Sequence, residues 1–255
     1  MKVITVSSQE QGVGKSVIAV HLAYYLREIG KSVLVVDLAY TDNTSRTLSE
    51  FECGIRAPDL FCGPVQRLLA RRAPRLALIR SDIDQEQTRW RRGEFGGSLE
   101  SAVARLDENL AELAPAFDYC VVDTAPGLCN RARAAVIASD LVVMPIASVC
   151  DSVDDVQRYL VNSAVMSIRH LFRSGRTGLL RSRYRAVGQK ARADRDMLAS
   201  MPPKSVLDGH VAESDDICEA LIRRMPVWSL QTKSARKPAA SMRTAMQAVV
   251  TSASA

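Results

Sequence analysis

Short apolar segments alternate with segments of helical periodicity along the chain, and this alternation restricts the fold more than any other feature of the sequence. Near-continuous apolar runs are typical of strands buried on both faces of a parallel sheet. Strands are predicted at residues 2–7, 32–37, 76–80, 119–123, 141–146, 177–182 and 205–207. Helices are predicted at residues 15–29, 99–113, 132–139, 153–172, 215–223 and 239–250. Right-handed crossovers between such strands give an α/β, doubly wound fold with a mostly parallel sheet.

The length and composition of the chain favour one domain over residues 1–255. With 255 residues, of which 47% are hydrophobic, the chain can bury a sizeable core, and general disorder is excluded. The least regular stretch is 52–95, which holds Pro58, Pro64, Pro74 and many arginines. We interpret this stretch as an insertion or a partner-binding loop, and the role of its arginine-rich segment 67–92 stays open.

The first predicted strand leads directly into a glycine-rich turn and a lysine, an arrangement typical of a phosphate-binding loop (P-loop). Gly12 and Gly14 lack a Cβ, so the backbone can approach an anion at the N-terminus of the following helix. Lys15 is expected to neutralise the β- and γ-phosphates of ATP, and the Ser16 hydroxyl to hold Mg²⁺. Gln9 stands where the strict motif has its first glycine. The predicted nucleotide contacts are Gln11, Gly12, Val13, Gly14, Lys15, Ser16 and Val17.

A second motif supports the nucleotide site. Asp123 ends an apolar strand and is followed by a turn containing Pro126 and Gly127. An acid at the carboxyl end of a strand beside the P-loop can hold the water shell of Mg²⁺, because sites in open parallel sheets lie at that edge. A plain helix N-cap is the alternative role for Asp123. Together the two motifs predict that the chain binds ATP and Mg²⁺.

Four further segments follow the P-loop in a recognisable order. They are VLVVDLAYTDN at 33–43, FDYCVVDTAPGL at 117–128, ASDLVVMP at 138–145, and a late strand, helix and Pro-Val at 206–227. In this combination the chain resembles the ParA/MinD family of P-loop ATPases, which position plasmids, chromosomes and large complexes. The resemblance implies a P-loop NTPase fold, an ATP-dependent homodimer and an adaptor or cargo protein as partner. It also implies catalytic roles for Lys15 and Asp37.

The sequence departs from the family pattern at two positions that serve hydrolysis. Relatives begin the P-loop with a signature lysine that reaches the phosphates across the dimer, and Glu10 stands there in this chain. Relatives place a second aspartate two residues after the first to orient water, and here that position is Ala39. Because phosphoryl transfer depends on positioning and charge stabilisation, we expect weak or absent ATP hydrolysis. Substitution by Asp42, or by a lysine elsewhere, is the alternative.

Positive charge gathers in two late parts of the sequence. Nine basic residues and one acid lie between 169 and 195, and six basic residues and no acid follow residue 220. ParA-type relatives bind DNA without sequence preference through such residues, which suits contacts to phosphates. The predicted DNA contacts are Arg181, Arg183, Arg185, Arg192, Arg223, Arg224, Arg236 and Lys237. We expect a cytoplasmic protein that associates with the nucleoid when it holds DNA.

The last predicted helix offers a competing surface. Met242, Ala245, Met246 and Val249 fall on one face, as in the membrane-binding helix of MinD-type relatives. That face is small and lacks Phe, Trp and Leu, so we expect it to pack on the sheet and a membrane partner to be absent.

Two alternatives to a DNA-partition function stay open. One is a hydrolysis-poor scaffold of a conjugation, secretion or cellulose-export complex that acts through protein partners. A metabolic P-loop ligase is the weaker one, because no substrate motif accompanies the nucleotide site. The adenine contacts are unassigned, since residues 178–184 lack the asparagine that relatives often use there.

The six cysteines show no C-x-x-C pair and no zinc-ligand spacing. We therefore expect reduced, buried thiols in a cytosolic protein. No signal peptide is recognised at the N-terminus, and no apolar run approaches the length of a membrane span, about 20 residues.

Overall fold

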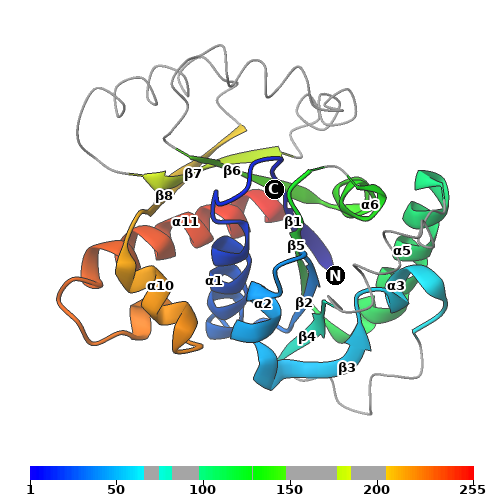
Figure 1. The fold of residues 1–255 in the computed structure, drawn as a ribbon, viewed down its shortest axis with the longest axis horizontal. Coiled ribbons are helices and arrows are strands. Elements are labelled where there is room, and N and C mark those ends of the chain that lie inside the picture. Colours follow the sequence, from blue (N-terminus) through cyan, green and yellow to red (C-terminus); the bar gives the residue numbers. More distant parts are fainter. Residues whose placement is uncertain (66–74, 82–97, 128, 148–176, 185–204) are drawn as a thin grey trace.

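A sheet of parallel strands forms the centre of the computed structural model, which describes residues 1–65, 75–81, 98–127, 129–147, 177–184 and 205–255. The described strands form one 8-stranded sheet in the order β3-β4-β2-β5-β1-β6-β7-β8 (Figure 1). They are β1 (Lys2–Val6), β2 (Val33–Leu38), β3 (Glu52–Arg56), β4 (Leu76–Arg80), β5 (Tyr119–Thr124), β6 (Leu141–Ala147), β7 (Thr177–Tyr184) and β8 (Val206–Ala212). This topology confirms the predicted doubly wound α/β fold.

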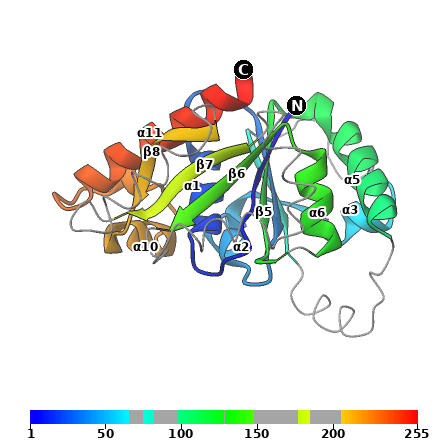
Figure 2. The ribbon, with the colours of Figure 1, turned by 90° about the horizontal axis from the view of Figure 1, so that it is seen from above.

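Helices cover both faces of the sheet, as Figure 2 shows with α1 and α11 on one side and α5 and α6 on the other. The described α-helices are α1 (Lys15–Glu28), α2 (Asn43–Thr47), α3 (Asp59–Cys62), α5 (Leu99–Leu113), α6 (Asn130–Ala138), α10 (Asp215–Ile222) and α11 (Arg236–Ser254). Short 3-10 turns are η1 (Ser49–Phe51), η2 (Ala114–Ala116) and η4 (Val227–Ser229). Alternate residues of a strand face opposite sides. In β2, Val33 and Val35 therefore join the core under α1 and α11, while Leu34 and Val36 join the core under α5.

The predicted elements agree with the structure best where strands are fully buried. The predictions for 76–80 and 99–113 match β4 and α5, but the irregular stretch 52–95 contains an edge strand, β3, that was not predicted. Its residues alternate between exposed and partly covered positions, and only Ile55 is buried, so no apolar run marks it. Strand β8 and helix α11 extend beyond their predicted bounds. The predicted helix at 153–172 lies outside the described residues.

The apolar stripe of α11 packs inside the molecule. Met242, Ala245, Met246 and Val249 have no exposed surface and belong to the core that α1 shares. The prediction that this face packs on the sheet is confirmed. None of the described helices is long and apolar enough to cross a membrane.

The cysteines only partly match the expectation of buried thiols. All five within the described ranges are free, and Cys120 is buried, where burial raises its pKa to about 12. Cys62 and Cys218 are exposed, so the prediction is wrong for these two. No cluster of three metal-ligating side chains occurs in the described part of the chain.

A buried histidine joins α1 to η4. His21 Nε2 accepts a hydrogen bond from the Val227 N–H at 3.2 Å, so Nδ1 carries the proton of the neutral ring and donates to the Val17 carbonyl at 2.8 Å. Burial lowers the pKa of His21 to about 4. Protonation would remove the acceptor for Val227.

Acid is therefore expected to destabilise the fold through His21. Below its usual pKa of about 6.5 the ring gains a proton in the unfolded chain but stays neutral in the folded protein. The free energy of unfolding is therefore unaffected by the protonation of His21 above that pH. It should decrease, by a total of about 3 kcal/mol, as the pH falls from about 6.5 towards the pKa of His21 in the folded protein. Urea unfolding of the wild type and of His21→Gln across this range checks the prediction. The wild type should lose stability relative to the variant as the pH falls; parallel profiles would contradict the assignment.

Candidate nucleotide-binding site

The candidate site lies at the carboxyl ends of β1, β2 and β5, near the middle of the sheet. Sequence order reverses around β1, because the chain first builds the strands on one side of it and then those on the other. Such a switch point leaves a crevice for a ligand in open parallel sheets. The P-loop, residues 9–16, connects β1 to α1 there (Figure 1).

Backbone conformation prepares the P-loop for an anion. Gly12 and Gly14 have φ values of +77° and +88°, in the left-handed region that side chains rarely adopt. A Cβ on Gly14 would lie 2.9 Å from the Ser182 Oγ, so this position also has no space for a side chain. Gly14 is the N-cap of α1 and offers no side-chain cap, which leaves the first N–H groups of the helix for a ligand.

Lys15 lies across its own loop. Its Nζ donates a hydrogen bond to the Glu10 carbonyl oxygen at 2.6 Å, and the residue is buried. Burial lowers the pKa of Lys15, while the negative charges of Asp123 and Glu10 act in the opposite direction. The ammonium is therefore held within the P-loop, where phosphate oxygens can replace the carbonyl.

Two buried aspartates stand side by side behind the P-loop. Asp37 on β2 pairs in register with Asp123 on β5, and both residues are completely buried. Burial, and then the charge of Asp37, raise the pKa of Asp123 to about 7. A cation beside the pair would therefore favour the ionised form.

Asp123 has the features of a magnesium-site residue. Its Oδ2 accepts a hydrogen bond from the Thr44 hydroxyl at 2.7 Å, but no hydrogen bond reaches Oδ1 among the described residues. The Ser16 hydroxyl lies nearby and favours the ionised carboxylate. Hydroxyl and carboxylate oxygens are the ligands that Mg²⁺ prefers, directly or through water. Ser16 and Asp123 thus fit the predicted ion.

Both carboxylate oxygens of Asp37, the residue expected to be catalytic, already accept hydrogen bonds from the protein. Its Oδ1 accepts from the Ala39 N–H at 2.9 Å, and its Oδ2 accepts from the Ser45 N–H at 2.8 Å and the Ser45 hydroxyl at 2.6 Å. Burial raises the pKa of Asp37, and these hydrogen bonds oppose that shift. The geometry favours a positioning role, in which Asp37 fixes the loop that precedes α2.

The two residues that depart from the family pattern, Glu10 and Ala39, both lie at the candidate site. Glu10 is exposed on the P-loop, and the Ala39 side chain is buried beside the acidic pair. Asp42, the suggested substitute for the missing aspartate, precedes α2 and forms an ion pair with Arg46 at 3.0 Å. In this conformation the Asp42 carboxylate is held by an arginine.

Sequence reasoning missed three hydroxyl side chains of the site. Thr44 and Ser45 hold the two aspartates, and their position directly after a strand and an acidic turn was the available signal. Ser182 reaches Gly14 from β7, far away in the sequence, and no local pattern marks it.

The predicted DNA contacts separate into two places. Arg181 and Arg183 lie on β7, and the Arg181 guanidinium donates to the Gly209 carbonyl at 3.3 Å. Four others are exposed where α10 ends and α11 begins, at the same end of the molecule (Figures 1 and 2). These are Arg223, Arg224, Arg236 and Lys237. Arg185 and Arg192 lie outside the described residues.

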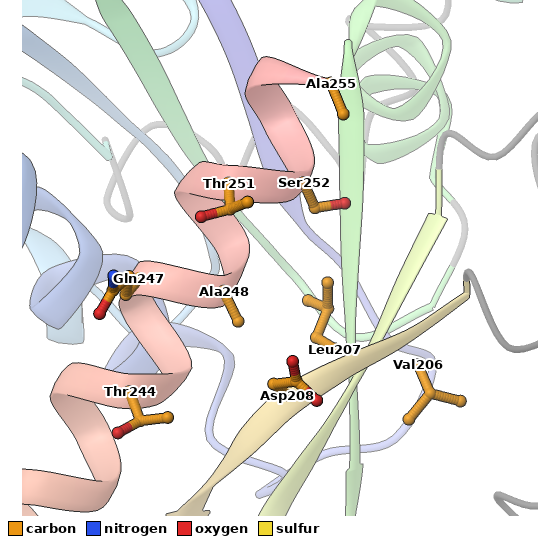
Figure 3. Close-up of a pocket in the computed structure, with 9 residues that line it drawn as sticks. All are labelled: Val206, Leu207, Asp208, Thr244, Gln247, Ala248, Thr251, Ser252 and Ala255. Atoms are coloured by element: carbon orange, nitrogen blue, oxygen red, sulfur yellow. The ribbon is translucent and has the colours of Figure 1, made fainter.

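A pocket of about 390 Å³ lies away from this site, between β8 and α11. Figure 3 shows its lining side chains, which come from the first residues of β8 and the second half of α11. They are at the amino end of β8, whereas the P-loop is at the carboxyl ends of the strands. Among the described residues that line it, Asp208 has the one charged side chain, so the described lining offers little specific chemistry.

A protein-family model and several known proteins resemble this chain over most of its length. Residues 1–169 match a protein-family model described as an AAA domain. The chain is 29% identical over 242 residues to one protein IncC of Escherichia coli, and 30% identical over 256 residues to another. These alignments cover 93% and 95% of this chain but 65% and 67% of the relatives, so the chain spans about two thirds of their length.

Solved structures share the fold over nearly the whole chain. McdA of Cyanothece in complex with ATP has a TM-score of 0.72 at 22% identity, covering 97% of this chain and 96% of its own. The cell division ATPase MinD of Pyrococcus furiosus has a TM-score of 0.69 at 18% identity, covering 98% of each chain.

Proposed function

This chain belongs to the ParA/MinD family of P-loop ATPases, and we propose that it is a long-lived nucleotide switch for DNA partition or subcellular positioning. In this proposal it binds ATP with Mg²⁺, dimerises on ATP, and then holds DNA without sequence preference. A cargo or adaptor protein is the expected further partner. Hydrolysis is slow, so the ATP state persists.

The observation that carries the proposal is the arrangement of Lys15, Ser16 and Asp123 around an unblocked helix N-terminus. A buried ammonium, a hydroxyl, and a carboxylate oxygen that accepts no hydrogen bond from the described residues supply the charges and oxygen ligands that a magnesium–nucleotide complex needs. Binding is therefore supported by features that this chain retains.

Slow hydrolysis is supported by two groups that relatives have and this chain lacks. Ala39 carries no group that can orient water, and the carboxylate of Glu10 lies on the P-loop where relatives have a cation. Asp37 uses both carboxylate oxygens to hold its own loop.

DNA binding is supported by unpaired charge at the C-terminal end. Arg224, Lys233, Arg236 and Lys237 are exposed, and no ion pair holds them within the described part of the chain. We call these four residues the C-terminal basic surface. Arg223 nearby is engaged by Glu219 at 2.6 Å. Such a surface suits phosphates, which give affinity without sequence preference.

Restoring the two lost groups is expected to speed hydrolysis. In a single-turnover experiment with labelled ATP and excess protein, the wild type should keep most bound nucleotide as ATP. The double variant Glu10→Lys with Ala39→Asp should convert it roughly 10- to 100-fold faster, because each added group acts on the reacting phosphate or water. The two single variants are the controls, with melting temperatures measured for all. Equal rates in the wild type and the double variant would show that these positions do not limit hydrolysis.

A further inference from the structure

The end of β7 brings two side chains to the P-loop that the nucleotide motif does not contain. The Ser182 Oγ is buried, has no hydrogen-bond partner among the described residues, and lies 2.9 Å from the place of a Cβ on Gly14. The Arg183 Nη1 lies 3.9 Å from the place of a Cβ on Gly12. A buried hydroxyl and a guanidinium therefore face the two glycines that shape the cradle.

Arg183 is held in this position by its backbone and by an ion pair. Its φ of +51° is uncommon for a residue with a side chain, and such conformations persist where the surroundings fix them. Its Nη2 donates to Glu213 Oε1 at 3.0 Å, while Nη1 remains on the P-loop side. The guanidinium is about half exposed, so a ligand can reach it.

We propose that Arg183 contacts the β- and γ-phosphates of ATP bound to its own chain, and so supplies the positive charge that Glu10 withholds from the P-loop. A guanidinium presents several N–H donors in one plane and suits phosphate oxygens better than a lone ammonium does. Glu213 holds the arginine at the mouth of the loop before the nucleotide arrives. The inference rests on the proposed function, because it assumes that ATP binds at this P-loop.

Nucleotide titrations with fluorescent ATP and ADP analogues test the proposal. Arg183→Ala should weaken binding of the ATP analogue roughly 10-fold and that of the ADP analogue less, because the lost contact includes the γ-phosphate. Arg183→Lys should recover part of the loss. Arg105→Ala is the matched control, since it removes an exposed arginine on α5 that also pairs with a glutamate, away from the P-loop. Unchanged ATP affinity in Arg183→Ala would overturn the inference.

A second variant separates phosphate contact from a structural role. Glu213→Gln breaks the same ion pair but keeps the arginine, so ATP affinity should fall less than in Arg183→Ala. A loss equal to that of Arg183→Ala would mean that the ion pair, and not the phosphate contact, matters.

If the wild type bound neither analogue, the proposed function itself would fail. If the wild type binds both analogues and Arg183→Ala binds them with the same affinities, the proposed function stands and the inference alone is wrong.

Discussion

Replacing Lys15 with alanine is expected to weaken ATP binding about 100-fold, the largest functional effect of any single change considered for this chain. The ammonium is buried in the P-loop, where its hydrogen bond to the Glu10 carbonyl marks a position that a phosphate oxygen can take. Charge-assisted hydrogen bonds to phosphate are among the strongest that a side chain can make. Isothermal titration with ATP and Mg²⁺ measures the loss directly.

Lys31→Ala is the matched control, because it removes the same charge from an exposed position just after α1. That variant should bind ATP like the wild type. Thermal unfolding of both variants verifies that the fold is retained. A loss of less than about threefold in Lys15→Ala would contradict the nucleotide site, since so small an effect is below that of one charged hydrogen bond.

The largest expected effect on stability comes from a glycine under the last helix. Gly209 on β8 has a φ of +82°, and a Cβ there would lie 2.9 Å from the Ala245 backbone nitrogen. The helix backbone cannot rotate away as a side chain would, so α11 must shift from the sheet. Gly209→Ala is expected to lower the free energy of unfolding by roughly 4 kcal/mol, combining backbone strain and overpacking.

Gly54 offers a matched comparison for this effect. Its φ is +86°, almost the same, but nothing lies within 4 Å of the place of its Cβ. Gly54→Ala should therefore cost only the conformational strain, about 1 kcal/mol. Urea unfolding of the two variants separates strain from contact. Equal losses in both would show that the packing of α11 on Gly209 is looser than described.

The sequence predicted the central sheet because buried parallel strands have a composition of their own. Strands β1, β2, β4, β5 and β6 are apolar almost throughout, and their buried positions follow one another without interruption. The edge strand β3 was missed since it is largely exposed and contains Gly54. Strand β8 was predicted too short for the same reason, as the partly exposed Gly209 and His210 interrupt its apolar pattern.

For the candidate site, the sequence predicted those residues that are neighbours in the sequence. Gly12, Gly14 and Lys15 form one local motif, and the structure places them together between β1 and α1. The contribution of β7 depends on the sheet order, which places its carboxyl end near the P-loop although more than 160 residues separate Gly14 from Arg183. Arg183 was expected among the DNA contacts because its charge, but not its place, is visible in the sequence.

Fluorescence anisotropy on random-sequence duplex DNA tests the central claim most directly, with ATP, with ADP and without nucleotide, across a salt series. The proposal predicts tight binding with ATP alone, with affinity that falls steeply as salt rises. Changing Arg236 and Lys237 to alanine should flatten that salt dependence, while Arg105→Ala on α5 should not. Weak binding in every nucleotide state would contradict the switch for DNA partition and favour a scaffold that acts through protein partners.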